Sequence, residues 1–120
     1  MTWEVLLWKD VEAWLLGLGD SDYALVAAAI TRLETAGPTL GRPLVDRVQG
    51  SRFHNMKELR PGSKGRSEIR ILFVFDPRRR AVLLVAGDKS GRWSHWYDEH
   101  IPVADERFET WLKEEVREHG

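Results

Sequence analysis

The stretch from Arg52 to Lys89 gathers most of the side chains of this chain that could carry out chemistry. It is rich in arginine and lysine, whose side chains hold phosphate oxygens, and it also contains a histidine and a glutamate. The arginine fork contacts two phosphate oxygens at once, so it suits a phosphate that gains charge during a reaction. The candidates for proton transfer are Glu58, His54, His95 and Tyr97, although a structural or solvated role is as typical of each.

Charge is distributed unevenly along the 120 residues. The region 42–92 holds 13 of the 18 Lys and Arg residues and 5 of the 19 Asp and Glu residues, which gives it a net charge of +8. The rest of the chain carries −9, so the total is only −1. A basic middle between acidic flanks favours binding to a polyanion such as nucleic acid, although a salt-bridged surface without such a partner would give the same count.

Three runs predict consecutive strands of an antiparallel meander: residues 52–60, 66–75 and 81–86. Strict alternation places His54, Glu58 and Arg60 on one face of the first strand. In the second strand it places one wholly apolar set on the face that should meet helices, namely Ile69, Ile71, Phe73 and Phe75. Arg70 then stands on the opposite face, which we expect to be uncovered.

Helical spacing predicts two helices before this meander and one after it. Residues 11–18, with Asp10 as N-cap, and residues 20–35 should form a helical hairpin that covers the apolar face of the sheet. We expect a short strand at residues 3–7, a loop at residues 39–50 and a final helix after Ile101-Pro102. The predicted order is β-α-α-β-β-β-α, a small antiparallel-rich sheet in one α+β domain over residues 1–120.

Several classes of protein and site are disfavoured by composition. The chain has no cysteine, which removes disulfides and thiolate metal sites. Its histidines lack metal-ligand spacing apart from His95 and His100, which are more typical of a surface, so we expect no metal and no cofactor. No apolar run approaches the ~20 residues of a membrane span, and the amino terminus is too acidic for a signal peptide. These features predict a soluble, cytoplasmic protein with no membrane partner.

The chain resembles the RelE/ParE superfamily of bacterial toxins, and within it the phage-Gp49-like, HigB-type branch. The resemblance follows the order of elements over nearly the whole chain. Its specific part is a combination of four motifs: ELR, then a strand arginine before ILFVFD, then LLVAGDK, and then IPVA before the last helix. The resemblance implies a ribosome-dependent messenger-RNA endoribonuclease that is inhibited by an antitoxin, usually a HigA-like helix-turn-helix protein.

The resemblance also implies roles for individual residues. Arg70 matches the strand arginine of the family, Lys89 the basic residue after the last strand, and Arg60 the arginine that closes the first strand of the meander. Tyr97 lies near a catalytic tyrosine of some members. RelE-type members carry a lysine where this chain has Glu58, which leaves the proton-transfer groups open. The predicted catalytic residues are Arg70, Lys89, Arg60, Glu58, His54 and Tyr97.

Cleavage of RNA by its own 2′-OH needs a base, a group that stabilises the phosphorane and an acid for the leaving oxygen, and it needs no metal. Trp93, Trp96 and Tyr97 could stack on unpaired bases, and we expect one tryptophan to do so while the other packs under the last helix. The predicted RNA contacts are Lys57, Lys64, Arg66, Arg78, Arg79, Arg92 and Trp93.

Two other functions stay open on the sequence. The chain could be a non-catalytic ParE-like toxin that acts on DNA gyrase, or a degenerate toxin that binds only its antitoxin or nucleic acid. The pair of Arg70 and Lys89 beside aromatic residues favours the ribonuclease. In each case we expect an acidic or amphipathic antitoxin segment to cover the basic face of the sheet.

Overall fold

The structure is a computed structural model that describes residues 2–62 and 65–119. Its elements are β1 (Glu4–Leu7), α1 (Lys9–Leu16), α2 (Asp20–Ala36), the short 3-10 helix η1 (Gly37–Thr39), β2 (Val45–Arg47), β3 (Lys57–Leu59), β4 (Ile69–Asp76), β5 (Arg80–Asp88) and α3 (Ser94–His119). They form a five-stranded sheet in the order β1-β5-β4-β3-β2, in which β1 and β5 are parallel and the remaining pairs antiparallel. The predicted α+β class and the meander of β3, β4 and β5 are confirmed.

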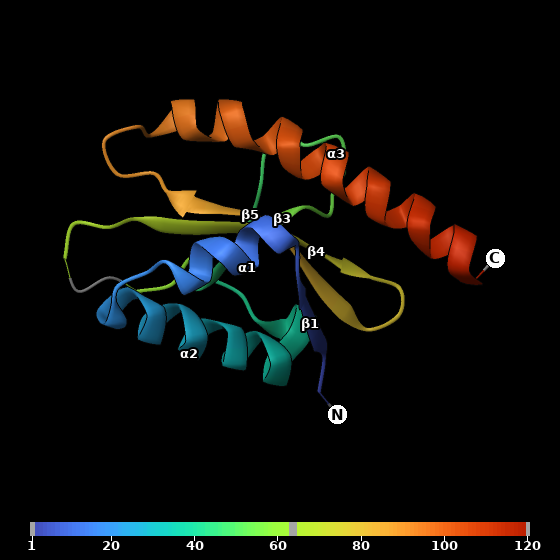
Figure 1. Ribbon diagram of the computed structural model, residues 1–120, viewed down its shortest axis with the longest axis horizontal. Helices are drawn as coiled ribbons and strands as arrows, with labels where there is room; N and C mark the ends of the chain where they lie inside the picture. Colours follow the sequence, from blue (N-terminus) through green and yellow to red (C-terminus); the bar gives the residue numbers. More distant parts are fainter. Residues whose placement is uncertain (1, 63–64, 120) are drawn as a thin grey trace.

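Helices cover both faces of the sheet (Figure 1). α1 and α2 pack on one face, where Ile69, Ile71 and Phe73 are buried and Phe75 is partly buried, as alternation predicted. α3 packs on the other face, over Leu72 and Val74 of β4. The expectation that this second face is uncovered is therefore wrong. Leu72 and Val74 alternate with the first apolar set and are also apolar, so they form part of a second buried core.

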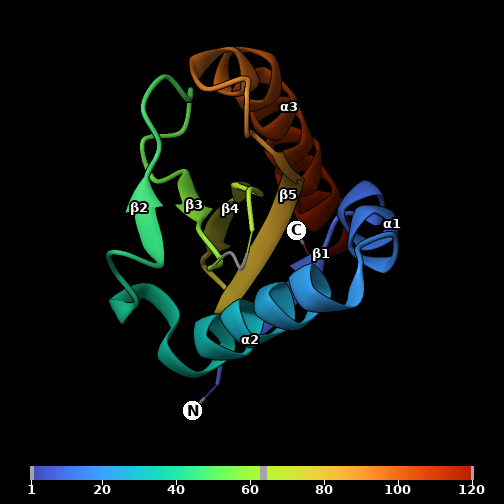
Figure 2. The same ribbon diagram turned by 90° about the vertical axis from the view of Figure 1, so that its left-hand side faces the viewer.

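α3 runs over one part of its face of the sheet. It contacts β5 and β4, whereas β3 and β2 lie farther along the sheet, as Figure 2 shows from one end. Trp96, which is 1% exposed, anchors the start of α3 against β5. Gly87 permits this approach, because a Cβ atom built there would lie 2.8 Å from Nε1 of Trp96. None of the helices in the described part of the chain is long and apolar enough to cross a membrane.

α3 begins before the proline that was expected to precede it. Pro102 lies inside the helix and has no N–H to donate, which weakens one turn. The upstream residues are helical nonetheless, because Trp96 and Ile101 bury their side chains in the second core, and such packing outweighs local propensity. Asp10 also differs from its prediction: α1 is preceded by Trp8 with no side-chain cap, and Asp10 lies in the first turn.

Two strands differ from their predicted form. The first strand of the meander spans only Lys57–Leu59, and the residues before it form a turn. That turn is tied to α3, because the buried carboxylate of Asp105 accepts hydrogen bonds from Ser51 Oγ and Arg52 N. The segment predicted as a loop contains β2, which pairs with β3 through three residues. The glycines and prolines around β2 indicated a loop, but whether so short a segment forms a strand depends on its pairing with a neighbouring strand.

Candidate active site

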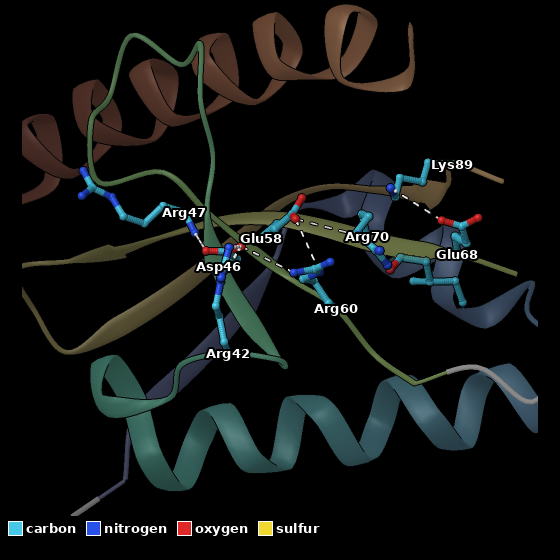
Figure 3. A network of polar contacts seen from close by, with 9 residues as sticks. Arg42, Asp46, Arg47, Glu58, Arg60, Glu68, Arg70 and Lys89 are labelled. Atoms are coloured by element: carbon cyan, nitrogen blue, oxygen red, sulfur yellow. Dashed lines mark hydrogen bonds and ion pairs between the residues drawn. The ribbon is translucent and has the colours of Figure 1, made fainter. Parts of the chain in front are cut away.

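Glu58 and Arg70 project from neighbouring strands toward the α3 side of the sheet (Figure 3). Glu58 pairs directly with Leu72, and Arg70 precedes Leu72 by two residues, so both share its face. Only 8% of the Glu58 side chain and 11% of the Arg70 side chain are exposed, and Oε1 of Glu58 lies 4.0 Å from Nε of Arg70. A carboxylate and a guanidinium thus face each other where little water can screen them.

Arg60, just after β3, bridges Glu58 to a second carboxylate. Its Nε lies 3.7 Å from Oε1 of Glu58, and its Nη1 lies 3.5 Å from Oδ2 of Asp46 on β2. A hydrogen bond from Arg42 is the largest of the effects that lower the pKa of Asp46 below its usual range. Arg60 is 34% exposed, so it is the more accessible of the two arginines beside Glu58.

Tyr97 reaches this cluster from the first turns of α3. Burial, followed by a hydrogen bond to Glu58 and the charge of that carboxylate, raises the pKa of Tyr97 to about 12. The phenol is therefore neutral and protonated near pH 7. Its neighbour Trp96 is buried against the sheet, and this packing fixes where Tyr97 can reach.

Lys89 and Trp93 lie on the other side of Tyr97. Nζ of Lys89 is 5.3 Å from the ring centroid of Trp93, 5.5 Å from that of Tyr97 and 3.6 Å from Oε2 of Glu68. Trp93 is 66% exposed and has a φ of 47°, which is rare for a bulky residue. The turn holds it there, because the carbonyl of Lys89 accepts a hydrogen bond from the backbone N–H of Trp93. An exposed indole beside a cation is a suitable surface for an unpaired base.

Two buried polar atoms in the cluster have no hydrogen-bond partner among the described residues: Oε2 of Glu58 and Nε of Arg70. Arg70 is held instead by Nη1, which donates to the carbonyl of Ile69 at 2.8 Å. Leaving such atoms unpaired costs about 1–3 kcal/mol each, and native structures contain few of them. Unsatisfied groups of this kind are typical of sites that complete their hydrogen bonding with a ligand.

The structure brings together four of the six predicted catalytic residues, and Lys89 lies at the edge of this group. His54 does not join them: it is exposed in the turn before β3, because the strand that was expected to align it with Glu58 is shorter than predicted. His95 is exposed in the first turn of α3. The expectation that Arg70 and Lys89 stand at an open surface is also wrong, since their side chains are only 11% and 12% exposed.

The predicted RNA contacts do not form one patch. Lys57 lies on the opposite face of the sheet, with Nζ 5.4 Å from the ring centroid of Phe75. Arg78 and Arg79 occupy the β4–β5 turn, at the opposite end of β4 from Arg70. Arg66 is exposed before β4, and Arg92 is paired with Glu99. Lys64 lies outside the described residues.

Of the two tryptophans, Trp93 is exposed, whereas Trp96 is buried against β5 from the first turn of α3 and is stacked on the ring of His100, with the ring centroids 4.5 Å apart. Stacking of Trp93 on a base stays a prediction. Among the described residues, no three His, Cys, Asp or Glu side chains come together in a way that could hold a metal ion.

Sequence reasoning missed the contribution of β2 and the residues after it. Asp46 and Arg47, with Val48 and Gln49, border the cluster beside Arg60, Glu58 and Tyr97. The only available signal was the pair of valines around Asp46-Arg47, because β-branched residues favour strands. That signal was weaker than the surrounding glycines and prolines.

Comparison with known proteins decides the family. Residues 13–109 match the model of the family described as phage derived protein Gp49-like. The chain belongs to the Gp49-like family. Two relatives of this Gp49-like protein come from Mycobacterium tuberculosis. The putative toxin HigB2 is 63% identical over 100 residues, which are 83% of this chain and 50% of HigB2. The putative toxin HigB3 is 55% identical over 116 residues, which are 97% of this chain and 96% of HigB3.

The Gp49-like protein therefore spans about half the length of HigB2 and nearly all of HigB3. Among solved structures it resembles a double mutant of the E. coli toxin RelE in the free state, with a TM-score of 0.57 over 77% of this chain and 88% of that chain. The two sequences are only 9% identical, so this likeness shows the fold alone. The predicted phage-Gp49-like, HigB-type family is therefore confirmed, and the predicted RelE-like fold is confirmed by the likeness to RelE.

Proposed function

We propose that this Gp49-like protein is the toxin of a type II toxin–antitoxin pair and that it cleaves messenger RNA on the ribosome. The observation that carries the proposal is the buried Glu58 carboxylate beside two arginines, Arg60 and Arg70, with the protonated phenol of Tyr97 next to it. This set contains an acceptor for a proton, cations for a phosphate and a proton donor. These are the three functions that attack by the 2′-OH of RNA requires.

In the proposed reaction, Glu58 takes the proton of the 2′-OH, and the 2′-oxygen attacks the adjacent phosphorus. The bond from phosphorus to the 5′-oxygen breaks, and Tyr97 donates the proton that the leaving oxygen needs. The products are a 2′,3′-cyclic phosphate and a 5′-hydroxyl end, and the two side chains exchange their protons with solvent afterwards. Arg60, with Arg70 behind it, stabilises the charge that builds up on the phosphorane.

Geometry favours Glu58 and Tyr97 over the histidines for proton transfer. His54 and His95 are exposed and lie outside the cluster, whereas Glu58 and Tyr97 line the same pocket. A phenol with a pKa of about 12 is a donor at neutral pH and not a base. Trp93 and Lys89 would hold an unpaired base and a phosphate next to the reacting bond.

The same proposal assigns the partners. The protein would act in the cytoplasm, where ribosomes translate, and a HigA-like helix-turn-helix antitoxin would inhibit it. Support for an antitoxin comes from the relatives HigB2 and HigB3, which are described as putative toxins. Co-purification of the protein with the product of the adjacent gene tests this part, and a pair that fails to associate at micromolar concentration contradicts it.

Cleavage is tested with the purified protein, ribosomes and a translated messenger RNA, by mapping the 5′ ends of the products. We expect Glu58→Gln to lower the cleavage rate by about 100- to 10,000-fold, the usual contribution of a general base. The matched control is Asp46→Asn, which neutralises the neighbouring carboxylate that also contacts Arg60, and which should have a far smaller effect.

Full activity of a folded Glu58→Gln variant would remove Glu58 from the mechanism. If the folded wild-type protein leaves every transcript intact, the ribonuclease function is wrong. Inhibition of gyrase-dependent DNA supercoiling by the same preparation would then favour the ParE-like alternative, and inhibition of neither process would favour a degenerate toxin.

A further inference from the structure

A pocket of about 290 Å³ opens beside Glu58, on the side away from Lys89 and Trp93. It is lined by Arg47, Val48, Gln49, Glu58 and Tyr97, which come from β2, the residues after it, β3 and α3. Pockets for small organic ligands typically measure ~300–1,000 Å³, so this one suits a single flat ring system such as a nucleobase. It shares Glu58 and Tyr97 with the catalytic cluster, whereas Arg47, Val48 and Gln49 have no role in the proposed reaction.

The lining has the composition of a base-binding site. Val48 and the ring of Tyr97 supply apolar surface on which a base can lie. Arg47 is exposed, with Nη2 donating to the carbonyl of His54 at 3.4 Å, so its guanidinium plane is held at the edge of the pocket. Gln49 is exposed and carries both a donor and an acceptor, which is what hydrogen bonding to a base edge requires.

Glu58 supplies the independent sign of a ligand. Only 8% of its side chain is exposed, and Oε2 has no hydrogen-bond partner among the described residues. The oxygen is covered in the free protein, so a ligand reaches it when a neighbouring side chain shifts. Gln49 is exposed, so its side chain has room to move. A ribose hydroxyl that donates to Oε2 would satisfy it.

We infer that this pocket binds the nucleoside on the 5′ side of the cleaved bond, with its base between Val48 and Tyr97 and its 2′-OH directed at Glu58. The inference rests on the proposed ribonuclease function and adds a specificity site to it. Arg47 and Gln49 contact the base, so they set which nucleotide is preferred before the cut. The strand then passes Arg60 and Arg70 toward Lys89 and Trp93.

Binding is tested without cleavage by titrating the protein with AMP, GMP, CMP and UMP and with their 2′-deoxy forms, followed by backbone amide NMR. At least one ribonucleotide should shift the amide signals of Val48, Gln49 and Tyr97, and its deoxy form should bind more weakly. Signals of the β4–β5 turn report binding elsewhere. Shifts confined to that turn, or no shifts at all, would contradict nucleotide binding in the pocket.

Specificity is tested by mapping cleavage sites for Gln49→Ala and Arg47→Ala. Removing one hydrogen-bonded base interaction changes discrimination between bases by about 5- to 150-fold. The frequency of the preferred base on the 5′ side of the cut should therefore change by at least about 5-fold. The factor by which kcat falls should be smaller than the factor by which KM rises, because these residues bind the base and do not react. The control is Arg32→Ala, an exposed arginine on α2, which should keep the wild-type pattern.

The two proposals fail in different ways. In the first case, both pocket variants cleave with unchanged base frequencies while no nucleotide shifts the amide signals. That result would contradict the binding pocket and would still agree with the ribonuclease function. Nucleotide shifts at Val48 and Gln49 in a protein that cleaves nothing overturn the ribonuclease and leave a nucleotide-binding pocket.

Discussion

Arg60 and Arg70 contact the same carboxylate but differ in exposure, 34% against 11%. Arg60→Ala should lower the cleavage rate by about 100- to 1,000-fold, because removing one preorganised charge interaction costs ~2.7–4 kcal/mol. Its effect on stability should be the smaller of the two, because water screens the more exposed ion pair. Arg70→Ala should lower both the rate and the free energy of unfolding, since it leaves Glu58 buried with one cation fewer. Ribosomal cleavage and urea unfolding of each variant separate the two effects.

Arg70→Lys should restore part of the stability and less of the rate, because an ammonium cannot reproduce the guanidinium fork. An Arg70→Ala variant as stable as the wild type would show that the buried pair with Glu58 contributes nothing to folding. An Arg60→Ala variant with normal cleavage would exclude Arg60 from the site.

Tyr97 gives the protein a measurable dependence on alkaline pH. Its pKa is about 12 in the folded protein and 10.0 in an ordinary environment, mainly because burial disfavours the phenolate. The folded state thus prefers the protonated form, so this stabilisation is complete below pH 10 and is lost as the pH rises from 10 through 12. Tyr97→Phe cannot ionise, so its free energy of unfolding should fall less over that window. Urea unfolding at pH 9 and 11.5 measures the difference, and parallel losses in the two proteins would contradict it.

Gly87 controls how α3 sits on the sheet. A methyl group at this position would lie 2.8 Å from Nε1 of Trp96, and forcing a core apart in this way typically costs about 1–3 kcal/mol. Gly87→Ala should lower the thermal midpoint and also reduce cleavage, because Tyr97 moves with Trp96. Gly41→Ala is the control, since nothing lies within 4 Å of a Cβ there. A normal thermal midpoint for Gly87→Ala would show that Trp96 can shift without cost.

The far end of α3 is fixed by a separate ion cluster. Arg80 donates to Asp76 through Nε at 2.8 Å and to Glu115 through Nη2 at 2.7 Å, and Nε1 of Trp111 also donates to Asp76. Asp76 is itself 5% exposed and accepts two backbone N–H groups of the β4–β5 turn. α3 is thus held at both ends, by Trp96 over Gly87 and by this cluster, and the first of these contacts positions the turn of α3 that carries Tyr97.

At the scale of the molecule, Arg78 and Arg79 lie at the opposite end of the β4–β5 hairpin from Arg70 and Lys89. Arg78 and Arg79 are exposed in the turn, and Arg79 lies over the ring of Trp3. Replacing both should weaken association with RNA or ribosomes in a salt-dependent manner, with the salt slope falling by about 0.7–0.9 for each phosphate that the variant no longer neutralises. Asparagine is the better replacement for Arg79, whose φ of 61° it tolerates.

The rate of the cleavage step at saturating ribosome concentration should be unchanged in that variant, because the turn is far from Glu58. Binding measured at several salt concentrations, together with single-turnover cleavage, checks both parts. A fall in the single-turnover rate would place the turn in the reaction itself.

The apolar alternation of β4 predicted the face that meets the helical hairpin. The family motifs assigned site roles to Arg70 and Lys89, and those roles stay a prediction. The proximity of Glu58 and Tyr97 could not be predicted, because it depends on where α3 begins. Pro102 indicated a later start for this helix than the structure shows. The role of β2 was equally hidden, since three residues become a strand only against a partner. Alternation predicts which face of the sheet a residue lies on, but not which element covers that face. The predicted face of Arg70 was therefore correct, whereas its predicted exposure was too high.

The parallel pairing of β1 with β5 has a consequence for the nascent chain. Glu4 pairs with Arg80, and at ~5–20 residues per second the ribosome takes about 4–15 s to synthesise the residues between them. During that time β1 has no strand to join, and its backbone groups are open to other chains. The newly made protein is thus at most risk of aggregation before β5 emerges. Because Tyr97 follows β5, the candidate site is assembled only after that period has passed.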